Sequence, residues 1–257
     1  MADSSITAEL AEITRERRQI VAFGGGGFSQ ESGNPLLDDY VLSLTGKERP
    51  KVCFLATASG DADDYVVRFY REFGSRSDAS HLGLFKRQRG IADVREHLLS
   101  QDLIYVGGGS LVSLLGVWQG HGIDAILRDA WRKGIVLCGL SAGALCWFNR
   151  ALTAYYGPPE QIKGLGMLPW SFTAHYDSEH ERRREFHRGI DCGMPAGYAA
   201  DDGAAMHFVG DELHKVVSSR PNARGYSVRF DGRRVVEERL DTHYLGATDH
   251  AVEMAVA

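Results

Sequence analysis

Residues 135–148 read IVLCGLSAGALCWF, in which four apolar residues lead to a serine placed between two glycines. The apolar residues predict a buried strand, and the small residues after the second glycine predict a helix. Residues 139–143 (GLSAG) match G-x-S-x-G, the pattern in which a sharp strand-to-helix turn lifts a nucleophilic serine out of a sheet. We therefore interpret Ser141 as a nucleophile. The alternative is an ordinary glycine-rich turn.

Short apolar segments alternate with helical segments on both sides of this stretch. The apolar segments lack period-2 alternation, which is typical of parallel strands covered on both faces. The pattern predicts an α/β fold, with a single domain and a mostly parallel sheet flanked by helices. The expected strands are 19–23, 51–56, 81–85, 102–106 and 135–138, and the expected helices are 36–44, 63–73, 91–99, 111–118 and 123–131.

The final third of the chain has a different pattern, in which strand-like segments predominate. Residues 215–219, 226–230 and 235–240 are strand-like, and Asp231-Gly232 between the last two is a strong hairpin signal. We expect C-terminal antiparallel strands at the edge of the same sheet.

Three glycine-bearing loops follow expected strands, at 24–27, 107–109 and 139–143. Open α/β sheets bind ligands beyond the carboxyl ends of their strands. The three loops therefore predict a site at this edge before any single residue is assigned a role.

Composition narrows the class of protein. The 257 residues carry a formal net charge of −5 and show no basic stripe, which disfavours nucleic acid as a partner. No apolar run approaches the ~20 residues that a membrane helix needs, and no signal core is visible, so we expect no membrane partner and a cytoplasmic location. The four cysteines show no metal-binding spacing, and we expect no metal and no cofactor.

A nucleophilic serine needs a base. Of ten histidines, His175 ends the short strand-like run 171–175 (SFTAH), which places it at the same rim as Ser141. The other histidines lie in charged segments or lack a surrounding constellation. We therefore expect His175 to be the base.

Four segments together resemble the peptidase E family of serine peptidases, which includes aspartyl dipeptidases and cyanophycinases. They are 106–110 (VGGGS), 139–144 (GLSAGA), 164–176, which ends in His175-Tyr176, and 200–205 (ADDGAA). The likeness spans roughly residues 19–245. It implies a fold related to the class I glutamine amidotransferases, with Ser141 as nucleophile and His175 as general base. It also implies an oxyanion hole made of the backbone N–H groups of Gly109 and Ala142.

The sequence departs from the family at the acid. Aspartyl dipeptidases carry an Asp between the serine and the histidine, whereas here Glu160 is the only acid in that interval. Other members use Glu, so the resemblance implies Glu160 as the third catalytic residue. Asp177 is a rival acid. Asp201 and Asp202 either orient the base or bind a substrate amine.

The expected protein has an N-terminal arm or helix at 1–18 and a single α/β peptidase domain at 19–257. We expect a serine peptidase that hydrolyses small peptides through an acyl-enzyme on Ser141. We expect dipeptides with N-terminal Asp among its substrates. The sequence leaves open whether the chain forms a homodimer. One alternative is an α/β-hydrolase-type esterase that uses His243 as its base. Others are a nucleotide-binding module built on the 24–27 loop and a non-peptidase, amidotransferase-like protein that binds small molecules. In the peptidase interpretation, the 24–27 loop lets the backbone approach the cleft.

Overall fold

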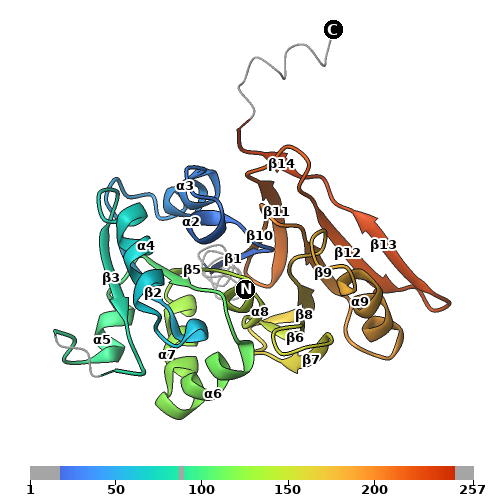
Figure 1. The fold of residues 1–257 in the computed structure, drawn as a ribbon, viewed down its shortest axis with the longest axis horizontal. Coiled ribbons are helices and arrows are strands. Elements are labelled where there is room, and N and C mark those ends of the chain that lie inside the picture. The colour runs from blue at the N-terminus through green and yellow to red at the C-terminus, as the bar shows by residue number, and fades with distance from the viewer. Residues whose placement is uncertain (1–17, 87–89, 247–257) are drawn as a thin grey trace, which may run out of the picture.

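The computed structural model describes residues 18–86 and 90–246 and shows a mixed α/β fold with two sheets (Figure 1). The arm or helix expected at 1–18 falls almost wholly outside the described residues. The first sheet has the strand order β14-β11-β10-β1-β5-β4-β2-β3, and the second has the order β13-β12-β9-β8-β6-β7.

The first sheet contains a strand for each one that the sequence predicts in the first half of the chain, but the strand expected at 81–85 lies three residues earlier, at Asp78–Leu82. Strands β1, β5, β4, β2 and β3 run parallel, β10 pairs with β1 in the antiparallel direction, and β11 pairs with β10. The bounds are β1 Gln19–Phe23, β2 Lys51–Leu55, β3 Asp78–Leu82, β4 Leu103–Val106, β5 Val136–Leu140, β10 Ala204–Val209, β11 Glu212–Ser218 and β14 His243–Tyr244.

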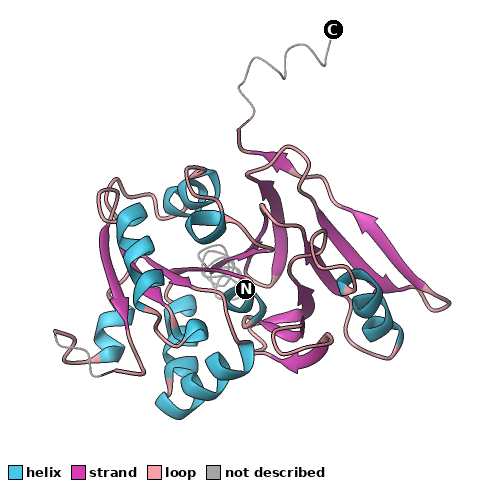
Figure 2. Cartoon of the chain, viewed as in Figure 1, coloured by secondary structure: helices cyan, strands magenta, loops and turns pink. Residues whose placement is uncertain are grey.

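Helices cover both faces of the first sheet (Figure 2). Alternate residues of β1, β4 and β5 belong to two separate apolar clusters, one shared with α6 and α7 and the other with α3 and α4. The strands are buried on both faces, which is why they read as continuous apolar runs. The helices are α2 Gly27–Gln30, α3 Leu36–Ser43, the 3₁₀ turn η1 Thr57–Ser59, α4 Asp63–Phe73, α5 Val94–Leu99, α6 Leu111–His121, α7 Ile123–Arg132, α8 Ala142–Leu145 and α9 Arg182–Asp191.

The second sheet corrects one expectation. The hairpin at Asp231-Gly232 forms as predicted, with Phe230 opposite Val235, but its strands pair with β9 rather than with the first sheet. Of the three C-terminal strands that the sequence predicts, the first corresponds to β11, which extends the first sheet through an antiparallel pairing with β10, and β14 adds to β11 in parallel. The second sheet comprises β6 Phe148–Thr153, β7 Glu160–Lys163, β8 Leu168–Thr173, β9 Gly197–Ala200, β12 Gly225–Phe230 and β13 Val235–Arg239.

The helix expected after Ser141 is a single turn. α8 ends at Leu145, and three residues later the chain is already in β6 of the second sheet. The chain thus passes from the first sheet to the second directly behind Ser141. It returns between β9 and β10, where Asp201 and Asp202 lie. In the described ranges no helix has the length and apolar character to cross a membrane.

Asp38 is a carboxylic acid inside the core, close to the end of the 24–27 loop. Among the described residues, neither of its carboxyl oxygens has a hydrogen-bond partner, and the Tyr105 hydroxyl is also unpaired. A Cβ on Gly27 would lie 2.7 Å from the Tyr105 hydroxyl and 3.1 Å from Asp38 Oδ1, so both groups fill the space beside this glycine. Burial raises the pKa of Asp38 to about 7.

This buried acid makes stability depend on pH. The folded-state pKa lies above the unfolded value of about 4, so the folded protein retains a proton that the unfolded chain releases. The stabilisation is complete below about pH 4 and is lost as the pH rises through about 7. Asp38→Asn keeps the shape without ionising. We expect it to raise the free energy of unfolding at about pH 8 by about 1–3 kcal/mol, with a smaller gain at about pH 5.

Chemical denaturation of the variant and the wild type across this pH range measures the difference. Asp39→Asn is the matched control, because Asp39 is its exposed neighbour on the same helix. An equal effect of the two substitutions at every pH would contradict the interpretation of Asp38.

Candidate active site

Ser141 lies at a strained turn directly after β5. Its backbone angles are φ 52° and ψ −120°, a conformation that non-glycine residues rarely adopt. A Cβ on Gly143 would lie only 2.2 Å from the Val106 carbonyl oxygen, so the residue two positions after the serine must be small. Tight packing of this turn against the end of β4 holds the serine side chain above the sheet, as the G-x-S-x-G pattern predicts.

His175 contacts Ser141 from the second sheet. It follows β8, and its Nε2 lies 2.9 Å from Ser141 Oγ. Its backbone N–H donates to the Gly24 carbonyl over 3.0 Å, and its φ of 55° turns the chain sharply at this point. The backbone hydrogen bond and the turn together fix the imidazole ring over the serine.

Asp202 is hydrogen-bonded to the other ring nitrogen of His175, Nδ1. Its Oδ1 lies 2.6 Å from His175 Nδ1. Burial by itself raises the pKa of Asp202, but the hydrogen bond to His175, the charge of that ring and the nearby Arg220 outweigh it and leave the pKa below its ordinary value. The group is therefore a carboxylate at neutral pH, it accepts a hydrogen bond from Nδ1–H, and Nε2 is the ring nitrogen that faces the Ser141 hydroxyl.

The 24–27 loop packs against this carboxylate. A Cβ on Gly25 would lie 2.1 Å from Asp202 Oδ1, and a Cβ on Gly24 would lie 2.4 Å from the Ala200 carbonyl oxygen. The Gly25 carbonyl also accepts a hydrogen bond from the Gly203 N–H at 3.1 Å. The space in which a nucleotide-binding loop would hold phosphate is thus filled by the chain itself, and the loop brings backbone up to the cleft.

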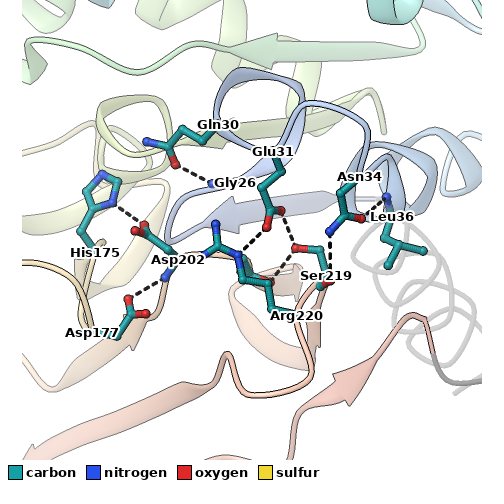
Figure 3. A network of polar contacts seen from close by, with 11 residues as sticks. Gly26, Gln30, Glu31, Asn34, Leu36, His175, Asp177, Asp202, Ser219 and Arg220 are labelled. Carbon is teal, nitrogen blue, oxygen red and sulfur yellow. Dashed lines mark hydrogen bonds and ion pairs between the residues drawn. The ribbon is translucent and has the colours of Figure 1, made fainter.

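A polar network supports Asp202 from behind (Figure 3). The backbone N–H of Asp202 donates to Asp177 Oδ1 over 2.8 Å. Arg220 lies beside Gly203 and pairs through Nε with Glu31 Oε1 at 2.5 Å, while Ser219 donates to the other oxygen of Glu31. This network holds the turn on which Asp202 lies.

The other acids named from the sequence do not contact His175. Both ring nitrogens are taken by Ser141 and Asp202, which corrects the expectation of Glu160 as the partner of the base. Glu160 is exposed at the start of β7, at the edge of the second sheet, opposite Thr153. The Asp177 side chain instead accepts a hydrogen bond from the backbone N–H of Asp202, as described above.

Asp201 points away from the imidazole. Its Oδ2 accepts the Arg224 N–H at 3.0 Å, and burial followed by the charge of Asp177 raises its pKa to about 6. His243, the base that an α/β-hydrolase would use, is exposed on β14 at the far edge of the first sheet.

Two backbone amides adjoin the serine. A Cβ on Gly108 would lie 3.4 Å from Ser141 Cβ, so the 107–109 loop packs directly against the nucleophile. Within the described part of the chain, the N–H groups of Gly109 and Ala142 have no acceptor. They are the amides expected to hold an oxyanion. In residues 18–86 and 90–246 no cluster of three or more His, Cys, Asp or Glu side chains could hold a metal ion.

Comparison with known proteins agrees with this arrangement. The sequence profile of peptidase family S51 matches residues 20–216. A Bacillus subtilis (strain 168) protein described as the uncharacterized peptidase YgaJ is 46% identical over 231 residues, which cover 89% of this chain and all of that protein.

Two solved structures share the fold. A peptidase from an acI-B1 actinobacterium aligns with a TM-score of 0.61 at 18% identity, over 87% of this chain and 94% of its own. A putative peptidase E protein from Listeria monocytogenes EGD-e aligns with a TM-score of 0.52 at 18% identity, over 87% and 99%. The chain belongs to peptidase family S51, the peptidase E family, and is a peptide-bond hydrolase.

Sequence reasoning missed a contact behind the 107–109 loop. Tyr65 is buried in α4, and its hydroxyl accepts the Gly108 N–H at 3.2 Å. The spacing of Tyr65, Phe69 and Phe73 indicates only an aromatic core stripe, which these residues also form. Nothing in the spacing reveals that one hydroxyl reaches the loop.

The contact between Gly25 and Asp202 can be tested directly. No positive φ is needed at Gly25, so alanine fits the backbone, but its methyl group would push the carboxylate away from His175. We expect Gly25→Ala to lower kcat about 10²- to 10⁴-fold while the protein stays folded. Steady-state peptidase kinetics and thermal unfolding measure both effects.

Gly120→Ala provides the control, because a Cβ there meets no atom within 4 Å. Wild-type kcat in Gly25→Ala would show that the close packing of the loop on Asp202 has no catalytic consequence.

Proposed function

We propose that Ser141, His175 and Asp202 form the catalytic triad of a serine peptidase that works through an acyl-enzyme. The observation that carries the proposal is the pair of contacts on one imidazole, 2.9 Å from Nε2 to Ser141 Oγ and 2.6 Å from Nδ1 to Asp202 Oδ1. A serine, a base and an orienting carboxylate in this geometry constitute the arrangement used for acyl transfer.

The reaction follows from the proton positions. His175 Nε2 takes the Ser141 proton as Oγ attacks the scissile carbonyl carbon, and Asp202 stabilises the imidazolium that results. The imidazolium then gives this proton to the leaving amine, and the C–N bond breaks. Water, deprotonated by His175, attacks the acyl-enzyme ester and releases the acid product together with free Ser141.

The negative charge that develops on the carbonyl oxygen needs donors. The unpaired N–H groups of Gly109 and Ala142 flank Ser141 and serve this purpose in the proposal. Because α8 is only one turn long, its dipole adds little, and the two individual amides provide most of the stabilisation.

The substrates we propose are short peptides, with dipeptides that begin with Asp included on the strength of the family resemblance. We also propose that the enzyme works in the cytoplasm. All four cysteines are free thiols, and three of them are buried, which suits a reducing compartment.

Ser141→Ala tests the nucleophile. We expect kcat to fall by roughly 10⁶-fold, because the group that becomes acylated is lost, with an unchanged circular dichroism spectrum. A fluorophosphonate probe should label the wild type and not the variant. Undiminished hydrolysis in Ser141→Ala would rule out the acyl-enzyme mechanism.

The choice of acid is tested by a pair of isosteric variants. Asp202→Asn keeps the shape but donates to Nδ1, which forces the wrong tautomer of His175, and we expect kcat to fall by about 10⁴-fold. Glu160→Gln, which alters an exposed side chain on β7, should leave kcat unchanged. The opposite outcome, an active Asp202→Asn and an inactive Glu160→Gln, would restore Glu160 as the acid.

A further inference from the structure

A pocket of about 460 Å³ opens next to the 107–109 loop. Its walls come from the turn after β2, the segment after β3, the first half of α6, and the segment between β6 and β7. The residues that define these walls are Ser59, Ser110, Gly116, Phe85, Tyr155 and Tyr156. None of the lining residues within 18–86 and 90–246 is an acid, a histidine, a lysine or an arginine.

Exposed aromatic side chains gather in this pocket. Seven large hydrophobic side chains are exposed among the described residues, and three of them line it: Phe85 at 50%, Tyr155 at 54% and Tyr156 at 71%. The rings of Tyr155 and Tyr156 meet edge to face, 4.7 Å apart. Apolar surface left open to water in a concave place is typical of a ligand site.

Hydrogen bonds hold the walls of the pocket together. Trp118 Nε1 on α6 donates to Thr57 Oγ1 on η1 over 3.1 Å, which ties two walls to each other. The Phe85 N–H donates to Asp61 Oδ2 over 2.8 Å, which anchors the segment that carries the Phe85 ring. These two hydrogen bonds therefore hold the η1, α6 and Phe85 walls in place without a ligand.

The strand order places the pocket on one side of Ser141 and the base on the other. In the order β10-β1-β5-β4-β2, Asp202 precedes β10 and His175 is bonded to the end of β1, whereas Ser141 follows β5. Ser110 follows β4, and Ser59 follows β2. The Ser110 N–H donates to the Ala58 carbonyl over 2.8 Å and so joins the pocket to the 107–109 loop.

This order assigns the two halves of a substrate. The leaving amine must lie on the side of His175, because Nε2 gives it a proton. The acyl half then extends away from His175, past the 107–109 loop and toward the pocket. Ser110 lies two residues from Gly108, at most about 7 Å along the chain, and Gly108 packs against Ser141. This distance suits the side chain of the residue whose carbonyl is attacked.

We propose that the pocket binds an aromatic side chain on the acyl side of the scissile bond, so that the enzyme prefers peptides cleaved after Phe or Tyr. The proposal rests on the proposed function. An aromatic ring gains from burial and from edge-to-face contacts with Phe85, Tyr155 and Tyr156. Among the described residues that line the pocket, an acidic side chain finds no cation.

The test uses dipeptides that differ only on the acyl side: Phe-Leu, Ala-Leu and Asp-Leu. Release of leucine is followed by chromatography, with Ser141→Ala as the blank. We expect kcat/KM for Phe-Leu to exceed that for Ala-Leu and for Asp-Leu by at least roughly tenfold. A preference for Asp-Leu, or equal values for the three dipeptides, would overturn the proposal.

A pair of helix variants locates the preference in the pocket. Gly116 and Gly120 both lie in α6, and a Cβ on either meets no atom within 4 Å, but only Gly116 lines the pocket. Gly116→Leu fills the pocket, so we expect the ratio of Phe-Leu to Ala-Leu kcat/KM to fall by roughly tenfold. Gly120→Leu adds the same side chain elsewhere on the helix and should leave the ratio unchanged.

The outcomes separate this proposal from the proposed function. Hydrolysis that depends on Ser141 but shows no aromatic preference overturns the pocket assignment and leaves the triad in place. An equal loss of activity toward Phe-Leu and Ala-Leu in Gly116→Leu does the same. Hydrolysis that is the same in the wild type and Ser141→Ala overturns the acyl-enzyme mechanism and, with it, the pocket assignment.

Discussion

The hydrogen bond from the His175 N–H to the Gly24 carbonyl, 3.0 Å long, fastens the second sheet to the first at the site. The base belongs to one sheet and the nucleophile to the other, so their 2.9 Å contact depends on this attachment. A side chain at Gly24 would collide with the carbonyl oxygens of Ala200 and Asp201, and the two sheets could not approach. One glycine at the end of β1 therefore permits the close contact between His175 and Ser141.

The three proposed catalytic residues all lie where the chain enters or leaves a sheet. Ser141 begins the passage from the first sheet to the second, and Asp202 lies on the return. Ser141 and His175 both have positive φ, each at a cost of about 1–3 kcal/mol. Packing of both sheets supports this strain, so a loss of inter-sheet packing would disturb the site before it unfolded either sheet.

Ser141 and His175 were predictable because each depends on a local signal, a glycine-flanked serine after an apolar run and a histidine at the end of a short strand. The choice of carboxylate was not, because its position depends on the path of the chain, and Asp202 was only one of several candidates. Glu160 lies between the two in sequence but on an edge strand, whereas Asp202 comes from β9–β10, which runs back beside β1. The second sheet was missed for a related reason: α8 and the first residue of β6 belong to one run of small and apolar residues, 142–148, that reads as a single helix.

The order of the residues along the chain has a consequence for synthesis. Asp202 emerges from the ribosome after Ser141 and His175, and β10, which seats it against β1, is later still. Until then His175 lacks its contact with the Asp202 carboxylate. Strand β1 also lacks β10, its antiparallel neighbour in the first sheet. A nascent chain from which β10 has not yet emerged consequently lacks the contact between Asp202 and His175.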